Sequence, residues 1–197
     1  DILNLELLNI LDYNYIYSDK PIQRIKTKPT LENSLAKLEI LKKKIEAIQN
    51  CDLKKNASKI VFGDGDIQSS IMIIGEGPGQ KEDELGKPFV GDAGNLLNKM
   101  LKAIKIERQK IYITNVVNYK PPNNRKPEHS EINRYSEYLK EHIAIIDPKI
   151  LILMGSTAME AILGSNKKIS KERGQWKEVI IGKKNYKVIV TFHPAYL

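Results

Sequence analysis

Short apolar runs separated by amphipathic stretches are the main feature of the hydrophobic pattern along this chain. The runs cover residues 71–74, 111–117, 149–154 and 187–191. Runs of this kind are typical of strands that are buried on both faces of a parallel sheet. Between them, apolar residues recur at steps of three and four, which predicts helices over residues 93–106, 130–146 and 156–163. Alternating strands and helices predict an α/β fold whose parallel sheet is flanked by helices.

The N-terminal part of the chain has a different pattern. Residues 1–17 predict a short helix with a broad apolar face, and the stretch up to residue 29 contains two prolines and predicts a linker. Thr30 is a suitable N-cap for an amphipathic helix over residues 31–48, with lysines on its outer face. We therefore expect a helical extension and linker over residues 1–29, followed by one main domain over residues 30–197.

Turn-forming residues predict how the remaining segments are arranged. Residues 51–69 lack a periodic pattern and contain a Gly-Asp-Gly-Asp turn signal, so they predict a loop. Residues 178–181 form a further apolar run, and with residues 187–191 they predict a hairpin around residues 182–185. Ser156 is expected to cap the helix that begins beside it.

Composition and charge narrow the classes of function. Of the 197 residues, 41% are hydrophobic and 28% are charged, as in an ordinary soluble globular protein. No apolar run approaches the roughly 20 residues that a membrane span needs, so we expect no membrane partner. The formal net charge of +8 fits a polyanion partner such as nucleic acid, and it fits equally well a lysine-rich composition without one.

Cysteine and histidine usage points away from disulfides and metal sites. Cys51 is the single cysteine, which excludes an intrachain disulfide and fits a reducing compartment, so we expect a cytoplasmic protein. The three histidines, His129, His142 and His193, are far apart in sequence and have no metal-ligand spacing.

A glycine-rich stretch over residues 75–94 directly follows the first apolar run. Ligands of open α/β sheets bind at the carboxyl ends of the strands, which makes this loop a candidate site. The stretch lacks the Gly-Lys-Ser/Thr ending of a Walker A motif, and Pro78 interrupts the glycine spacing of a dinucleotide fingerprint. A tight turn is the alternative interpretation, with a solvated face formed by Glu82, Asp83 and Glu84.

Three side chains near strand ends are candidates for binding a nucleobase. Phe89 lies within the glycine-rich stretch, Asn115 lies toward the carboxyl end of the strand predicted from the second apolar run, and His193 follows the last run. A phenylalanine can stack on a base, and a carboxamide can read one edge of a pyrimidine because it carries a donor and an acceptor. The alternatives are a core plug, a strand-ending cap and a structural histidine. Because parallel strands end at one edge of the sheet, we expect the three side chains to converge.

Five motifs of this chain occur in the same order in family 4 uracil-DNA glycosylases. They are G-E-G-P-G-x-x-E-D from residue 75, G-x-P-F-V-G-x-A-G-x-L-L from 86, T-N-V-V from 114, P-P-x-N-R-x-P from 121 and H-P-A-Y-L from 193. The chain resembles this family over residues 30–197. The resemblance implies a three-layer α/β/α sandwich with a four-stranded, mainly parallel central sheet. It also implies a monomeric, monofunctional glycosylase that removes uracil from DNA and so initiates base-excision repair.

The resemblance implies a role for several of these residues. Phe89 would stack on a uracil flipped out of DNA, and Asn115 would hydrogen-bond its edge. His193 would donate toward the uracil O2 as negative charge develops on the leaving base. Backbone groups of Glu76 and Gly77 would line the pocket, where glycine permits a close approach.

The group that directs water at the sugar is left open by the resemblance. Related families place an aspartate where this chain has Gly77, so Glu82 and Glu76 are the candidates for acid–base catalysis. Glu82 could instead exclude the methyl group of thymine. Candidates for contact with DNA phosphates, with surface solvation as their alternative role, are Lys120, Arg125 and Lys126.

Members of the family typically hold a 4Fe–4S cluster with four cysteines. In the motif alignment Cys51 matches one ligand position, and the other three fall on Ile48, Tyr119 and Tyr135. One thiolate cannot hold such a cluster, so we expect a cluster-free protein without a cofactor, in which these side chains fill the volume by apolar packing. The loss of the cluster also motivates an alternative function, a catalytically weak DNA-binding module that retains the glycosylase fold.

Overall fold

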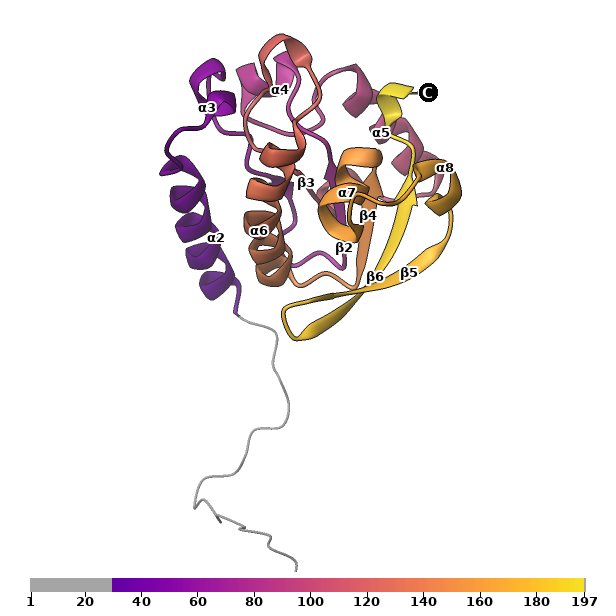
Figure 1. Cartoon of the computed structure of the whole chain (residues 1–197). Coiled ribbons are helices and arrows are strands. Elements are labelled where there is room, and N and C mark those ends of the chain that lie inside the picture. The colour runs from indigo at the N-terminus through magenta and orange to yellow at the C-terminus, as the bar shows by residue number, and fades with distance from the viewer. Residues whose placement is uncertain (1–29, 197) are drawn as a thin grey trace, which may run out of the picture.

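A sheet with the strand order β1-β3-β2-β4-β6-β5 forms the centre of the computed structural model, which describes residues 30–196 (Figure 1). Its strands are β1 (Asp64–Gly65), β2 (Ile71–Gly75), β3 (Tyr112–Asn115), β4 (Ile150–Met154), β5 (Trp176–Ile181) and β6 (Lys184–Thr191). The four inner strands are parallel, as expected, whereas β1 and β5 pair antiparallel with β3 and β6. The expected α/β fold is confirmed, and the two edge strands widen the four-stranded sheet to six.

Helices cover both faces of this sheet. They are α2 (Leu31–Glu46), α3 (Asp52–Asn56), α4 (Gln80–Leu85), α5 (Asp92–Ala103), α6 (His129–Ile146), α7 (Ser156–Leu163) and α8 (Ile169–Glu172), with short 3₁₀ turns η1 (Arg108–Lys110), η2 (Pro122–Asn124) and η3 (Pro194–Tyr196). α6 and α7 pack on one face with α2 beside α6, and α5 packs on the opposite face (Figure 1). This is the predicted three-layer arrangement.

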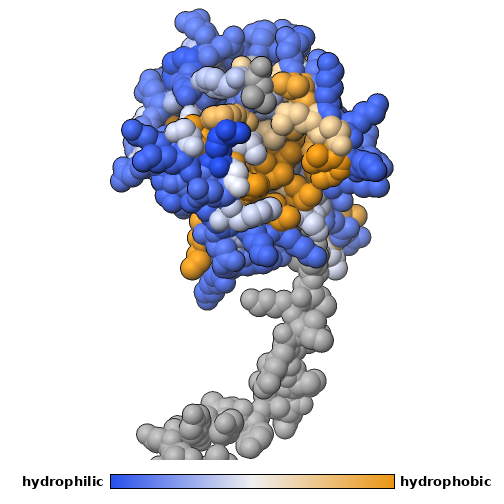
Figure 2. Space-filling view, turned by 90° about the vertical axis from the view of Figure 1, so that its right-hand side faces the viewer, coloured by the Kyte–Doolittle hydropathy of each residue, from blue (hydrophilic) through white to orange (hydrophobic). Residues whose placement is uncertain are grey.

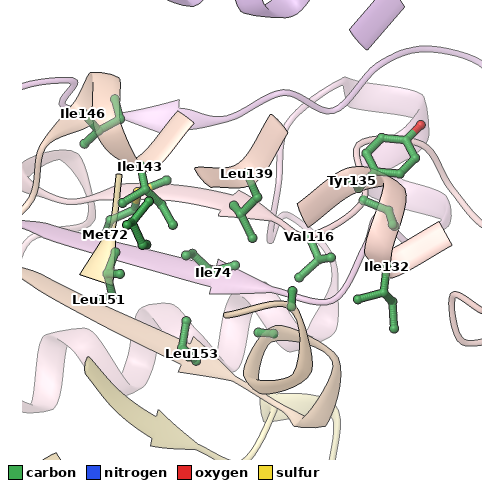
Figure 3. Packing of buried hydrophobic residues seen from close by; sticks show 14 of the residues in the cluster. Met72, Ile74, Val116, Ile132, Tyr135, Leu139, Ile143, Ile146, Leu151 and Leu153 are labelled. Atoms are coloured by element: carbon green, nitrogen blue, oxygen red, sulfur yellow. The ribbon is translucent and has the colours of Figure 1, made fainter. Parts of the chain in front are cut away.

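The alternation of side chains along β2 builds a separate core on each face. Met72 and Ile74 point toward α6, where Leu139 and Ile143 meet them (Figure 3). Ile73, between them, points to the other face and belongs to the cluster that includes α5 residues. All five side chains are almost completely buried. Burying an aliphatic side chain of this size contributes about 1.5–3 kcal/mol, so both layers are held to the sheet mainly by apolar burial.

Some predicted boundaries of helices and strands agree with the structure, and others differ from it. Thr30 caps α2 as predicted, accepting a hydrogen bond from the backbone N–H of Asn33 at 3.4 Å. Ser156 is the first residue of α7 rather than its cap, because Gly155 takes the cap position with φ +94°. Residues 51–69, predicted as a loop, also contain α3 and β1. The predicted hairpin is present as β5 and β6.

Residues 1–29, predicted as a helix and linker, lie outside the described part of the chain, so the domain boundary at residue 30 stays a prediction. Within residues 30–196, no helix combines the length and apolar character that crossing a membrane requires. Leu31 and Leu35 of α2 are about half exposed, although they fit the apolar period of that helix.

One side of the molecule leaves part of the sheet layer uncovered. On the side that lies right in Figure 1, an apolar area is visible between more hydrophilic surroundings (Figure 2). A groove between α5, α8 and β6 contains Met100, Val190 and Phe192. At the edge of the sheet, Trp176 and Ile180 of β5 expose 60% and 75% of their surface. α5 therefore covers its face of the sheet only in part.

Candidate active site

The carboxyl ends of the parallel strands bring the predicted site residues together. Gly75 ends β2 beside Asn115, which ends β3, and the two residues are partners in the ladder. His193 follows β6, which lies two strands away from β2. A cavity of about 220 Å³ at this edge is lined by Phe89, Asn115 and His193, and also by Glu76, Gly77 and Glu82. Phe89, Asn115 and His193 therefore converge on one cavity.

Phe89 belongs to the wall of the cavity and to the core at the same time. Its side chain is only 4% exposed and packs in the apolar cluster on the α5 face. Its ring stacks on the His193 ring with 5.5 Å between centroids and 29° between planes. The two interpretations of this residue, core plug and stacking surface, are thus compatible.

Close approach between Phe89 and Asn115 depends on Gly75. A Cβ atom at position 75 would lie 2.5 Å from Asn115 Oδ1 and 2.6 Å from the Phe89 ring. Such distances are shorter than van der Waals contact, so any larger residue would displace one of the two side chains. Asn115 is 3% exposed and lines the cavity, and none of the hydrogen bonds among residues 30–196 engages its carboxamide. The amide is thus available to a ligand.

His193 is held as a neutral imidazole that can donate from one nitrogen. Burial lowers its pKa, and the nearby carboxylates of Glu76 and Glu82 oppose that effect only in part. Its Nδ1 accepts the backbone N–H of Ala195 at 3.2 Å. In a neutral ring this acceptor role places the proton on Nε2. Gly155 lets the ring sit close to β4, because a Cβ there would lie 3.2 Å from His193 Cβ.

The acidic cluster of the glycine-rich stretch is not the solvated face that its charge suggests. Glu82 and Asp83 are 9% and 2% exposed. Glu82 Oε1 accepts the backbone N–H groups of Val90 at 2.9 Å and Gly91 at 2.7 Å. Asp83 accepts the backbone N–H of Ser58 at 2.9 Å. Glu82 binds backbone groups later in the same stretch and Asp83 binds one that precedes it, and of the three acidic residues only Glu84 is exposed.

Glu76 is a second glutamate that lines the cavity. Thr157, at the start of α7, donates its hydroxyl hydrogen to Glu76 Oε2. Gly77 follows it, and a Cβ at this position would lie 2.7 Å from Val117 Cγ2. A side chain at position 77 would therefore have to displace the buried side chain of Val117.

The comparison with known families agrees with this geometry. The model of the uracil DNA glycosylase superfamily matches residues 62–197. The chain belongs to this superfamily. The resemblance seen in the motifs is thereby confirmed.

Individual members of the superfamily match most of the chain. The type-4 uracil-DNA glycosylase of Thermotoga maritima is 40% identical over 161 residues, which are 81% of this chain and 82% of that protein. That of Sulfurisphaera tokodaii is 42% identical over 166 residues, covering 80% and 74%. That of Archaeoglobus fulgidus is 37% identical over 162 residues, covering 80% and 81%.

The basic residues expected at a glycosylase DNA surface differ in how much they are already engaged. Arg125 forms a two-pronged ion pair with Glu131, with both nitrogen–oxygen distances at 2.8 Å. The hydrogen bond from Arg125 lowers the pKa of the Glu131 carboxyl. Lys126 donates to the Ser156 hydroxyl at 3.2 Å, and Lys120 is half-buried beside the cavity-lining Pro121. Neighbouring groups therefore neutralise the positive charge of the two lysines less than that of Arg125.

The cluster-ligand positions of this superfamily member form a packed, largely apolar site. Cys51 Sγ lies 3.4 Å from the Tyr135 hydroxyl, and Tyr119 and Tyr135 are 5% and 0% exposed. Ile48 packs against the same core. Burial raises the pKa of Tyr119 to about 12 and also raises that of Tyr135, so both phenols stay protonated. One thiol, two neutral phenols and an isoleucine do not fit the ligand set of an iron–sulfur cluster.

Other residues of the site carry no recognisable sequence signal. Arg108 donates to the carbonyl groups of Pro88 and Phe89, although it lies in the short turn η1 outside the five motifs. Thr157 contacts Glu76 from a helix that the hydrophobic pattern marks only as amphipathic. Their roles follow from distances in space, which periodicity and motif spacing do not report.

Proposed function

We propose that this protein is a uracil-DNA glycosylase that hydrolyses the N-glycosidic bond of a deoxyuridine flipped out of DNA, the first step of base-excision repair. The observation that carries the proposal is the single cavity in which Phe89, Asn115 and His193 meet. The names of the similar proteins, type-4 uracil-DNA glycosylases, support the same activity. A stacked base inside a duplex cannot reach such a cavity, so the nucleotide is extruded before it reacts.

Recognition of the extruded base combines stacking with hydrogen bonding. Phe89 offers a ring face, and stacking of a base on an aromatic side chain contributes about 1–3 kcal/mol. A base inserted between the Phe89 and His193 rings would need about 7 Å, twice an ordinary carbon contact, and the centroids are 5.5 Å apart. The imidazole therefore meets the base at its edge. Asn115 supplies a donor and an acceptor to the pyrimidine edge.

Catalysis relies on stabilising the departing uracil anion. As the glycosidic bond breaks, its electron pair moves onto the base and the sugar becomes oxocarbenium-like. The Nε2–H of His193 donates to the oxygen on which the charge develops, as a donor in an oxyanion hole does. A neutral donor stabilises that charge through the hydrogen bond and keeps its own proton.

The two glutamates that line the cavity differ in how many hydrogen bonds they already accept. Glu82 Oε1 accepts two backbone N–H groups, so we assign it no proton transfer. Glu76 lines the cavity with only one hydrogen bond from Thr157, and we assign it the orientation of the attacking water. Motif reasoning gives both residues as candidates for this role, and the hydrogen bonds favour Glu76.

Binding of DNA involves the basic rim of the cavity. Lys120 and Lys126 are our candidates for phosphate contacts, which position the strand without reading its sequence. Arg125 contributes less because Glu131 already neutralises its guanidinium. We further propose that the protein acts as a monomer in the cytoplasm, with uracil-containing DNA as its partner.

The protein is proposed to work without an iron–sulfur cluster. Tyr135 and Cys51 form a hydrogen-bonded pair in the volume that cluster ligands would surround, and Tyr119 packs beside them. We expect less than a tenth of an iron atom per chain when the protein is purified without oxygen. Iron in stoichiometric amounts would show that the cluster assignment is wrong.

The proposed activity is tested with a uracil-containing oligonucleotide, single-stranded and double-stranded, followed by alkaline cleavage. We expect strand cleavage at the uracil position with the wild-type chain, and a loss of at least 100-fold with His193→Ala, because a single oxyanion donor contributes about 100- to 1000-fold. Lys110→Met, in an exposed ion pair away from the cavity, is the matched control. Binding of the oligonucleotide without cleavage would instead select the catalytically weak DNA-binding module.

A further inference from the structure

The backbone of Phe89 adopts a conformation that its own side chain disfavours. Its φ is +52°, in the left-handed region. For a residue with a Cβ this conformation is unfavourable, and it persists only where the surroundings fix it. The direction of the ring into the cavity follows from this backbone, so whatever fixes the backbone also fixes the stacking surface.

The N–H groups that follow Phe89 are held by a carboxylate. Glu82 Oε1 accepts from Val90 at 2.9 Å and from Gly91 at 2.7 Å. Hydrogen bonds to a charged partner are stronger than those between neutral groups, so these two bonds oppose the unfavourable conformation of Phe89. Glu82 comes from α4, so the contact ties the loop to a separate element.

The carbonyl groups on the other side of the turn are held by a guanidinium. Arg108 Nη2 donates to the Pro88 oxygen at 2.7 Å, and Nη1 donates to the Phe89 oxygen at 3.0 Å. Nη1 also donates to Asn98 Oδ1 at 3.1 Å, and Asp64 lies 3.6 Å from Nη2. The planar fork of an arginine can serve two carbonyl groups at once, which the single ammonium of a lysine cannot do with the same geometry.

α5 closes the third side of this loop. A Cβ at Gly94 would lie 2.0 Å from the Phe89 carbonyl oxygen, so the helix approaches the turn as closely as glycine allows. Phe89 is thus enclosed by α4, α5 and η1.

We propose that Glu82 and Arg108 are positioning residues, which hold the Pro88–Gly91 turn from its N–H side and its carbonyl side and thereby fix the Phe89 ring for stacking on the extruded base. The inference rests on the proposed function for its activity readout. Neither residue needs to touch the substrate, and the carboxylate of Glu82 acts through its hydrogen bonds rather than through proton transfer.

The proposal is tested with pairs of variants that separate hydrogen bonding from charge. In Glu82→Gln the amide oxygen can still accept both N–H groups, whereas Glu82→Ala removes the acceptor. We expect Glu82→Ala, Arg108→Met and Arg108→Lys to lower kcat/KM on uracil-containing DNA about 100-fold, as a misplaced binding group does. Glu82→Gln should stay within about 10-fold of wild type. Glu84→Gln on α4 and Lys110→Met on η1 are matched exposed controls.

Two further measurements show whether these residues act through Phe89. Amide hydrogen exchange at Val90 and Gly91 should become faster in Glu82→Ala and stay slow in Glu82→Gln. In a Phe89→Ala background, adding Arg108→Met should reduce kcat/KM by less than threefold, because the ring it positions is already gone. Melting temperatures identify any variant that fails to fold. The kcat/KM values of Glu82→Gln and Glu82→Ala then decide whether the hydrogen bonds or the charge of Glu82 matter.

Opposite outcomes would overturn the proposal. Glu82→Gln as inactive as Glu82→Ala, with slow exchange retained, would assign Glu82 to the chemistry. Full additivity between Arg108→Met and Phe89→Ala would remove the positioning role of the arginine. A wild-type chain that leaves uracil-containing DNA intact would contradict the proposed function, while the exchange rates would still report whether the turn is held.

Discussion

At the scale of single residues, Gly75 decides how closely two site side chains approach each other. Its missing Cβ leaves space for the carboxamide of Asn115 and the ring of Phe89. We predict that Gly75→Ala lowers kcat on uracil-containing DNA at least 100-fold, because one or both side chains shift by the order of an ångström. The rate of abasic-site formation measures the effect, and circular dichroism shows whether the fold is retained.

Gly182→Ala is the control for this prediction. Gly182 lies in the turn between β5 and β6 with φ +63°, and no atom would meet its Cβ within 4 Å. Alanine there costs about 1–2 kcal/mol of stability through the backbone but leaves the cavity untouched. If Gly75→Ala retained wild-type kcat, the tight packing of Asn115 and Phe89 would have no catalytic importance.

At the scale of elements, the contact of α6 with β3 contains a buried histidine that makes stability depend on pH. His142 is 2% exposed, stacks on Phe62 at 4.4 Å and has Nε2 at 3.0 Å from the Tyr112 hydroxyl. Burial lowers its pKa to about 3, from 6.5 in an unfolded chain. Below pH 6.5 the unfolded state therefore takes up a proton that the folded state refuses, and stability falls as the pH falls.

We predict that this residue alone reduces the free energy of unfolding by about 1.4 kcal/mol for each pH unit below 6, down to about pH 4. Urea denaturation at a series of pH values measures the slope. His142→Gln should flatten it by that amount. An equal slope in wild type and His142→Gln would mean that other groups cause the acid sensitivity.

The elements that sequence reasoning identifies are those whose pattern is long and apolar. The runs around Ile73, Ile113 and Ile152 become parallel strands because both of their faces are covered. β1 escapes such reasoning because two residues, Asp64 and Gly65, carry no apolar signal and pair only because β3 lies beside them.

The residues of the candidate site likewise fall into those that the sequence predicts and those that it does not. Phe89, Asn115 and His193 could be inferred, because Phe89 lies within a recognisable motif and the other two lie at or just after the ends of recognisable strands. The burial of Glu82 could not be inferred, since its acceptor role depends on backbone groups eight and nine residues later that fold back onto α4. Arg108 likewise acquires its partners only when η1 meets the glycine-rich turn.

At the scale of the whole molecule, the net charge of +8 gives binding to DNA a measurable dependence on salt. Each phosphate that a basic side chain neutralises contributes about −0.9 to the slope of log K against log salt for duplex DNA. Lys126 donates a hydrogen bond to the neutral hydroxyl of Ser156, whereas Arg125 is already paired with Glu131. Lys126 and Arg125 carry the same formal charge, but we expect Lys126 to bind a DNA phosphate more readily than Arg125.

We predict that Lys120→Met and Lys126→Met each make the slope less steep by about 1. Arg125→Gln should change it by clearly less, because the arginine charge is compensated before DNA binds. Fluorescence anisotropy of a labelled duplex, titrated at several salt concentrations, measures the slopes, and Lys44→Met on α2 serves as a control far from the cavity. If Arg125→Gln alone reduced the slope by about 1, the ion pair with Glu131 would open on binding, and the rim would present its charge only in the complex.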